Sequence, residues 1–120
     1  MSNPIEGQVI LLAGAKASVP LRRLPTLLSR AAVVLSDRRE SYDRRYERLH
    51  EDDDRRYYAV ESDHWTGLGD ELGFDDRETD AVRRAHTEQL LRAGRRADRR
   101  EEFQTTLEIR ECVVIERERE

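Results

Sequence analysis

The sequence predicts a mainly α-helical fold, a small bundle of about four helices. Three observations carry this prediction: apolar residues recur at helical spacing, capping residues mark helix starts, and proline and glycine stand where helices should begin or end. The chain has 120 residues and no low-complexity stretch, so one core is expected. We assign that core to a single domain over residues 1–115 and expect residues 116–120 to form a charged tail.

The first predicted helix covers residues 4–17, because Asn3 is a good N-cap and Pro4 suits the first helical position. Its apolar arc is expected to contain Ile5, Val9, Leu12 and Lys16 on one stripe, with Ile10 and Leu11 beside them. A second, longer helix is predicted over residues 25–50 from the same spacing. The acids of residues 51–54 should end it, since negative charge opposes the dipole at a helix C-terminus.

A tight pair of helices is predicted over residues 63–97. Asp63 can cap a short helix that Gly73 closes, because glycine tolerates the left-handed conformation after a helix. Asp75 and Glu78 have the spacing of a capping box and should begin a long helix. The expected hydrophobic anchors of this hairpin are Trp65, Leu72 and Phe74.

Two segments have β-strand character. Residues 56–61 have the length and composition of one short strand, which needs a partner. Residues 103–115 fit both helical spacing and strand alternation. A helix is favoured for them, and a strand that forms a short β pair with residues 56–61 is the alternative.

Residues 65–86 resemble the stretch from the second to the third helix of a death domain, an adaptor fold of six helices. The residues that carry the resemblance are Trp65, Leu68, Leu72, Gly73, Phe74, Asp80, Val82 and His86. The resemblance implies protein–protein assembly through charged helix faces and brings no catalytic residue with it. Convergence is the alternative, because any tight two-helix hairpin with an aromatic anchor gives this pattern.

The choice of charged residues is unusual. Lys16 is the single lysine among 22 basic residues, which stand against 26 acids. Arginine forms bidentate pairs with carboxylates, so such a composition can keep charged faces folded. The composition resembles that of small proteins of halophilic archaea, some of which belong to families of unknown function. A GC-rich genome would give the same arginine bias without physical selection.

Charges of opposite sign lie on neighbouring predicted helices. Residues 65–80 hold six acids against Arg77, a net charge of −5, and residues 83–100 hold seven arginines against two acids, a net charge of +5. Five arginines of the second segment share one helix face: Arg84, Arg92, Arg95, Arg96 and Arg99. We therefore predict an interaction module in which this arginine face meets acids of a second copy or of a partner protein. A regulator that binds nucleic-acid phosphates through the same face is the alternative, and a solvated, neutralised face is the simplest interpretation.

Other functional classes find little support in the sequence. The longest apolar run is far shorter than the roughly 20 residues of a membrane span, and no basic segment precedes it as in a secretory signal, so we expect a cytoplasmic protein. Cys112 is the single cysteine, and the three histidines have no metal-ligand spacing. We predict no catalytic residue, no metal and no cofactor, and therefore no enzyme.

Overall fold

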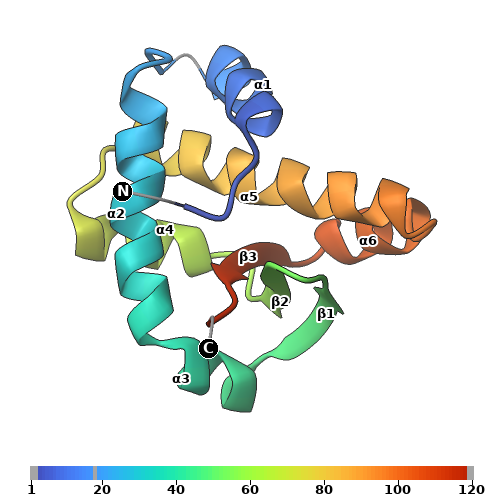
Figure 1. The fold of residues 1–120 in the computed structure, drawn as a ribbon. Coiled ribbons are helices and arrows are strands. Elements are labelled where there is room, and N and C mark those ends of the chain that lie inside the picture. Colours follow the sequence, from blue (N-terminus) through green and yellow to red (C-terminus); the bar gives the residue numbers. More distant parts are fainter. Residues whose placement is uncertain (1–2, 18, 119–120) are drawn as a thin grey trace.

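A three-stranded antiparallel sheet lies in the middle of the fold, with helices packed around it (Figure 1). The structure is a computed structural model that describes residues 3–17 and 19–118. In chain order its elements are α1 (Gly7–Ala17), α2 (Arg23–Asp37), α3 (Arg39–Arg45), β1 (Glu47–Glu51), β2 (Arg55–Val60), α4 (His64–Leu72), α5 (Asp76–Arg96), α6 (Arg100–Leu107) and β3 (Glu111–Glu116). The mainly helical class is confirmed. The expected count of about four helices and one β pair is too low, because these described ranges contain six helices and three strands.

The long helix α5 lies at the centre of the helical packing. Helix α1 contacts one side of α5 and strand β3 contacts another, so α1 and the sheet lie on different sides of this helix (Figure 1). One continuous core takes buried apolar side chains from each helix and strand. No helix within the described ranges is both long and apolar enough to cross a membrane.

The strand alternative for the C-terminal segment is confirmed, and so is part of the helix prediction. Helix α6 ends at Leu107, and β3 then pairs with β2 in the register that places Val113 opposite Tyr58. The segment has both characters because Phe103 packs into the core from a helix, whereas β3 is buried along four consecutive residues. A strand buried on both faces reads as a continuous apolar run and not as a clean alternation.

The second predicted helix is too long. It is divided at Arg38 into α2 and α3, and it ends before Tyr46, whose backbone is extended with φ −124° and ψ 153°. Residues 47–51 form the edge strand β1 instead, where Leu49 is buried. The acids that follow make a hairpin turn, because the Asp52 carboxylate accepts hydrogen bonds from two backbone amides.

The first helix begins at Gly7 and not at Pro4. The segment before it is tied to other elements: Arg55 Nε donates to the carbonyl oxygen of Pro4 at 2.5 Å, and the Glu6 amide donates to Gln89 Oε1 at 2.9 Å. These hydrogen bonds hold residues 4–6 outside the helix. Sequence spacing within one segment gives no signal for such long-range contacts.

The α4–α5 hairpin forms as predicted, except that Asp63 precedes α4 without making the expected capping hydrogen bond through its side chain. Gly73 ends α4 with φ 76°, in the left-handed region that glycine tolerates. The Asp75 carboxylate accepts from the Glu78 amide at 2.8 Å, and the Glu78 carboxylate accepts from the Asp75 amide at 2.9 Å. Both hydrogen bonds of the capping box are therefore present.

The outer edge of β3 is closed by side chains. Trp65 Nε1 donates to the carbonyl oxygen of Cys112 at 2.9 Å, and the Val114 amide donates to Nδ1 of His86 at 2.9 Å. The rings of Trp65 and His86 lie in contact, with centroids 4.5 Å apart. Farther along, Arg39 Nε donates to the carbonyl oxygen of Glu116 at 2.7 Å. These bonds satisfy backbone groups of β3 that β2 does not reach.

The expected charged tail begins inside the sheet. Glu116 is the last residue of β3, and the Arg117 amide donates to the carbonyl oxygen of Asp54 at 2.8 Å. The end of the expected tail, residues 119–120, lies outside the described residues. The division of the chain at residue 115 stays a prediction.

Acid should weaken the fold through His86. Burial lowers the pKa of His86 from 6.5 to about 3, so between these values the unfolded chain takes up a proton that the folded chain excludes. The free energy of unfolding should therefore be greatest above the unfolded pKa and fall by up to about 1.4 kcal/mol per pH unit as the pH decreases.

Urea denaturation of the wild type and of His86→Gln, between about pH 7 and pH 5, measures this slope. Glutamine offers an acceptor to the Val114 amide but does not titrate, so the variant should lose less stability in acid. Equal slopes for the two proteins would show that His86 is not excluded from protonation by the fold.

Candidate functional site

Two of the predicted interface arginines pair with acids close to them in the chain. Arg84 Nε lies 2.8 Å from Asp80 Oδ2, one helical turn away on α5. Arg99 Nη2 lies 2.7 Å from Glu102 Oε1, and its guanidinium carbon lies 4.6 Å from the centroid of the Phe103 ring. Both guanidinium groups are thus already engaged within their own chain.

Two more arginines of this face meet at Glu6. Arg96 donates to both carboxylate oxygens of Glu6, at 2.9 and 2.7 Å, and Arg92 Nε lies 3.4 Å from the same carboxylate. Gln89, which is fully buried, adds a hydrogen bond of 2.7 Å to Glu6 Oε2. The Arg96 hydrogen bonds are the main reason that the pKa of Glu6 is lowered from 4.5 to about 2. This cluster attaches the N-terminal segment to α5.

Arg95 is the exception on the predicted arginine face. Its side chain is exposed, and it has no acid partner among the residues that the structure describes. One unpaired guanidinium group is much less positive charge than the five that the predicted face was expected to offer a partner. The structure thus places four of the five arginines on α5, as predicted, but Arg99 lies beyond the end of this helix, at the start of α6, because the chain turns at Asp98 with φ 57°. All of the five except Arg95 pair with acids of the same chain.

The three predicted hairpin anchors lie at or near the core. Trp65 is fully buried and bonded to β3, and Phe74 is buried beneath Arg30, whose guanidinium carbon lies 5.0 Å from the ring centroid. Leu72 is partly buried and packs against the core. These residues connect α4 to α2, α5 and β3, and they act as structural residues of the hairpin.

An apolar surface on α1 is a feature that the sequence reasoning missed. The outer face of α1 contains Leu11, Leu12 and Ala15, all of them exposed, and Leu21 lies close to Gly14 near the C-terminal end of the helix. Gln8 is exposed as well, but its Oε1 accepts a hydrogen bond from Arg92 of α5 at 2.8 Å. Leu11, Leu12 and Leu21 are 54, 50 and 51% exposed. Leu12 and Lys16 were expected on the apolar stripe, but both are exposed, and Val9, Ala13 and Ala17 form the buried side of the helix.

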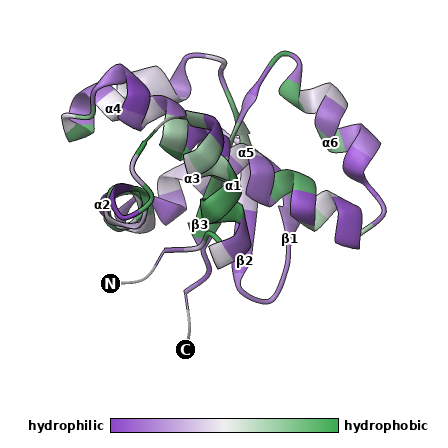
Figure 2. Ribbon diagram, turned by 90° about the horizontal axis from the view of Figure 1, so that it is seen from above, coloured by the Kyte–Doolittle hydropathy of each residue, from purple (hydrophilic) through white to green (hydrophobic). Residues whose placement is uncertain are grey.

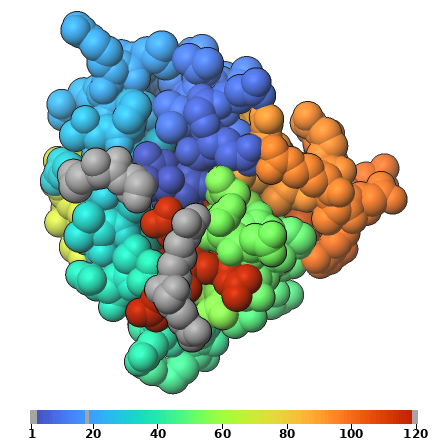
Figure 3. Space-filling view, viewed as in Figure 1, coloured from blue at the N-terminus to red at the C-terminus, as the bar shows by residue number. Residues whose placement is uncertain are grey.

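Figure 2 looks down on α1 and shows the green of apolar residues on the side of the molecule nearest the viewer. In the space-filling view the blue residues of α1 form an open surface beside those of the following turn (Figure 3). The composition of α1 could have indicated this surface. The helix is apolar at nearly every position, and a small domain can bury only one side of such a helix.

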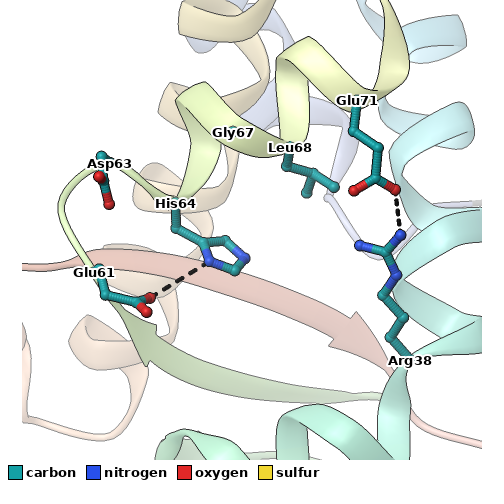
Figure 4. A pocket seen from close by; sticks show the side chains of 7 residues that line it. All are labelled: Arg38, Glu61, Asp63, His64, Gly67, Leu68 and Glu71. Atoms are coloured by element: carbon teal, nitrogen blue, oxygen red, sulfur yellow. Dashed lines mark hydrogen bonds and ion pairs between the residues drawn. The ribbon is translucent and has the colours of Figure 1, made fainter.

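A shallow pocket of about 410 Å³ lies between α4 and the end of α2 (Figure 4). On one wall, His64 Nε2 lies 2.6 Å from the Tyr42 hydroxyl and Nδ1 lies 3.5 Å from the Glu61 carboxylate. On the other wall, Arg38 forms a hydrogen-bonded ion pair with Glu71. Burial is the main reason that the pKa of His64 is lowered. Both side chains that could donate to a ligand here are already paired.

Cys112 is fully buried in β3, and burial raises the pKa of its thiol. A buried, protonated thiol packs as a small apolar group. Of the three histidines, His86 supports the edge of β3, His64 lines the pocket, and His50 packs against the ring of Phe103 with centroids 6.0 Å apart. Each of these side chains lies in a different part of the fold.

Comparison with known proteins gives one finding. Residues 3–117 match a protein family described as a domain of unknown function, DUF8048. The chain belongs to this family. The DUF8048 match runs from the segment before α1 to the residue after β3, so it covers every helix and strand described above. The curated proteins and the solved structures contain no significant match to the chain.

Replacing Glu6 in this DUF8048 chain should show whether its ion pairs stabilise the fold more than an exposed ion pair does. Glu6→Gln removes the charge that Arg96 and Arg92 share, and we expect it to lower the free energy of unfolding by about 1–2 kcal/mol at neutral pH. Because the pKa of Glu6 falls from 4.5 to about 2 on folding, its contribution is complete above 4.5 and is lost as the pH falls towards 2.

Glu102→Gln is the matched control, since Glu102 pairs with Arg99 in an exposed i,i+3 geometry. Thermal unfolding at neutral pH should show little change for the control and a clear decrease for Glu6→Gln. If the two variants unfold alike, the Glu6 cluster contributes no more than a surface pair.

Proposed function

We propose that the chain is a non-catalytic protein–protein interaction module whose contact surface is the outer face of α1. The observation that carries this proposal is the group of three half-exposed leucines, Leu11, Leu12 and Leu21, on one side of the molecule. Single exposed apolar residues are normal on protein surfaces, but apolar patches that continue from residue to residue usually mark a contact site.

Electrostatics favours α1 over the predicted arginine face as the contact surface. Four of the five arginines have acid partners within the chain, so a partner would have to displace Glu6, Asp80 or Glu102 to reach them. The leucines of α1 have no such competitor among the residues that the structure describes. Removing them from water is favourable at about 25 cal/mol per Å² of apolar area.

The composition supports a halophilic archaeon as the source, and we propose the cytoplasm of such a cell as the location. In concentrated salt, the attraction between exposed charges is screened beyond a distance of a few ångström, whereas apolar contacts keep their strength. An apolar contact surface is therefore the kind that would still bind a partner in such a cell. The resemblance of residues 65–86 to a death domain supports the same class of function, assembly, although it would place the contact on charged helix faces.

The alternative function is phosphate binding by the arginine face in a nucleic-acid-associated regulator. Arg95 supports it as an exposed guanidinium without an acid partner in the described ranges. One unpaired arginine gives a weak dependence of binding on salt, because each neutralised phosphate contributes about one unit to that slope. The observations on α1 outweigh this feature.

Photochemical cross-linking in living cells tests the proposed contact surface. A benzophenone amino acid replaces Leu11 in one full-length variant and Val33 of α2 in the matched control, since these side chains are 54 and 53% exposed. We expect the variant at position 11 to give at least about 5-fold more adducts, because its side chain lies in an apolar contact.

Equal adduct yields at the two positions would contradict the proposal, provided that circular dichroism shows both variants folded. Adducts to nucleic acid from a third variant, with the cross-linker at Arg95, would favour the alternative function.

A further inference from the structure

Arg39, the first residue of α3, differs from the other arginines that form no ion pair within the described residues. It is half-buried, whereas the others are exposed; they are Arg22, Arg30, Arg45, Arg77, Arg95 and Arg100. The Arg39 guanidinium donates only to neutral acceptors, the carbonyl oxygen of Glu116 at 2.7 Å and two oxygens of Ser36 at 3.4 Å. A positive charge that is partly removed from water without a counter-ion is unfavourable, so an anion beside Arg39 would stabilise it.

Arg39 lines a pocket of about 580 Å³ that can admit such an anion. Arg56 of β2 and Arg117, which follows β3, line the same pocket, so its arginines come from three separate segments of the chain. The end of β3 lies next to α3, which brings these segments together (Figure 1). The described lining residues include no aromatic side chain on which a nucleobase could stack.

Positive charge is in excess around this pocket. One ion-pair network joins its wall to β1, and its members are Asp43, Glu51, Arg48, Arg56 and Arg117. Three arginines and two carboxylates leave one positive charge in this network, and Arg39 brings the excess to two. Arg117 is also oriented by the carbonyl oxygen of Asp52, which accepts from its Nη1 at 3.0 Å. An arginine has five N–H donors, so these bonds leave donors of Arg117 for a ligand.

Two further acids line the pocket, and neither neutralises Arg39. The side chain of Glu40 is 94% exposed, and its ion-pair partner is Arg44 at 3.9 Å. Glu118 is exposed and forms no ion pair within the part of the chain that the structure describes. Its negative charge opposes the entry of an anion, so removing that charge should strengthen binding.

We propose that this pocket binds a small phosphate dianion, either inorganic phosphate or a phosphate monoester, through Arg39, Arg56 and Arg117. The excess of two positive charges matches the charge of the ligand. Phosphate oxygens point in several directions and can accept from guanidinium groups on different walls, whereas a carboxylate presents two oxygens in one plane. The site is separate from the contact surface on α1, and neither proposal depends on the other.

Isothermal titration calorimetry of the full chain tests the site, with inorganic phosphate, glycerol phosphate and acetate as ligands in a chloride-free buffer at about pH 8. Phosphate is almost fully dianionic there. We expect one phosphate per chain with a Kd below about 1 mM, and at least about 10-fold weaker binding of acetate. Glycerol phosphate should bind at least as tightly as inorganic phosphate if the ligand is an ester, and more weakly if it is the free ion.

Arg39→Gln should weaken phosphate binding at least about 10-fold, because it removes the charge that lacks a counter-ion. Arg95→Gln is the matched control, since it removes an equal charge from an exposed arginine without an acid partner in the described ranges. Glu118→Gln should strengthen binding about 2-fold. Circular dichroism confirms that each variant is folded, and Arg117→Gln, which should also weaken binding, gives the same test if Arg39→Gln does not fold.

Three results would overturn the site. They are the absence of saturable phosphate binding to the folded wild type, acetate binding as tight as that of phosphate, and equal losses in the pocket variant and in Arg95→Gln. The last result would show that phosphate responds only to the overall charge of the surface. Because none of these measurements involves α1, the failure of the phosphate site leaves the proposed contact surface unaffected.

Discussion

The fold depends on β3, a strand that is hydrogen-bonded along both edges although only one of these edges has a neighbouring strand. β2 pairs with one edge of β3, and the side chains of Trp65 and His86 bond the other. A buried backbone group without a partner costs about 1–3 kcal/mol, so these two side chains determine where α4 and α5 must lie. With α5 fixed against β3, α1 packs on a different side of α5, and its outer face remains open to solvent.

The arginine-rich composition has a largely internal explanation. Arginines pair with acids from distant segments, as Arg23 does with Glu78 at 2.5 Å and Arg96 with Glu6 at 2.7 Å. The guanidinium group suits such pairs because it is planar and offers several donors. The charged faces that suggested an external partner are therefore mostly satisfied within one chain. Contacts within one chain do not explain the exposed apolar residues. Three leucines lie on the outside of a small protein that has few apolar residues.

Local signals made part of the fold predictable. The capping box of Asp75 and Glu78 and the left-handed Gly73 act over fewer than five residues, so their spacing in the sequence was enough. The edge strand β1 was not predictable in this way, because Leu49 fits a helical stripe and a strand equally well and its pairing depends on β2. Helix propensity and apolar spacing are weaker than such tertiary contacts.

The candidate site shows the same limit. Four of the five arginines were correctly placed on one helix, whereas Arg99 lies beyond its end. Their acid partners could not be foreseen, since Glu6 and Arg96 are 90 positions apart. The outer face of α1 was missed for a related reason. A helix that is apolar on all sides has no periodic signal to indicate which side the core takes, and only the position of α5 decides it.

If the outer face of α1 is the contact surface, it must be open to solvent in the free chain. Nuclear magnetic resonance with a dissolved paramagnetic probe measures this directly through the methyl groups of Leu11, Leu12 and Leu21 in a dilute sample. Ile109, which is 74% exposed in another part of the fold, and Leu28, which is 1% exposed, are the internal references. The three leucines should be broadened by the probe as strongly as Ile109, while Leu28 is unaffected. Leucines that are as well protected as Leu28 would contradict the proposed contact surface.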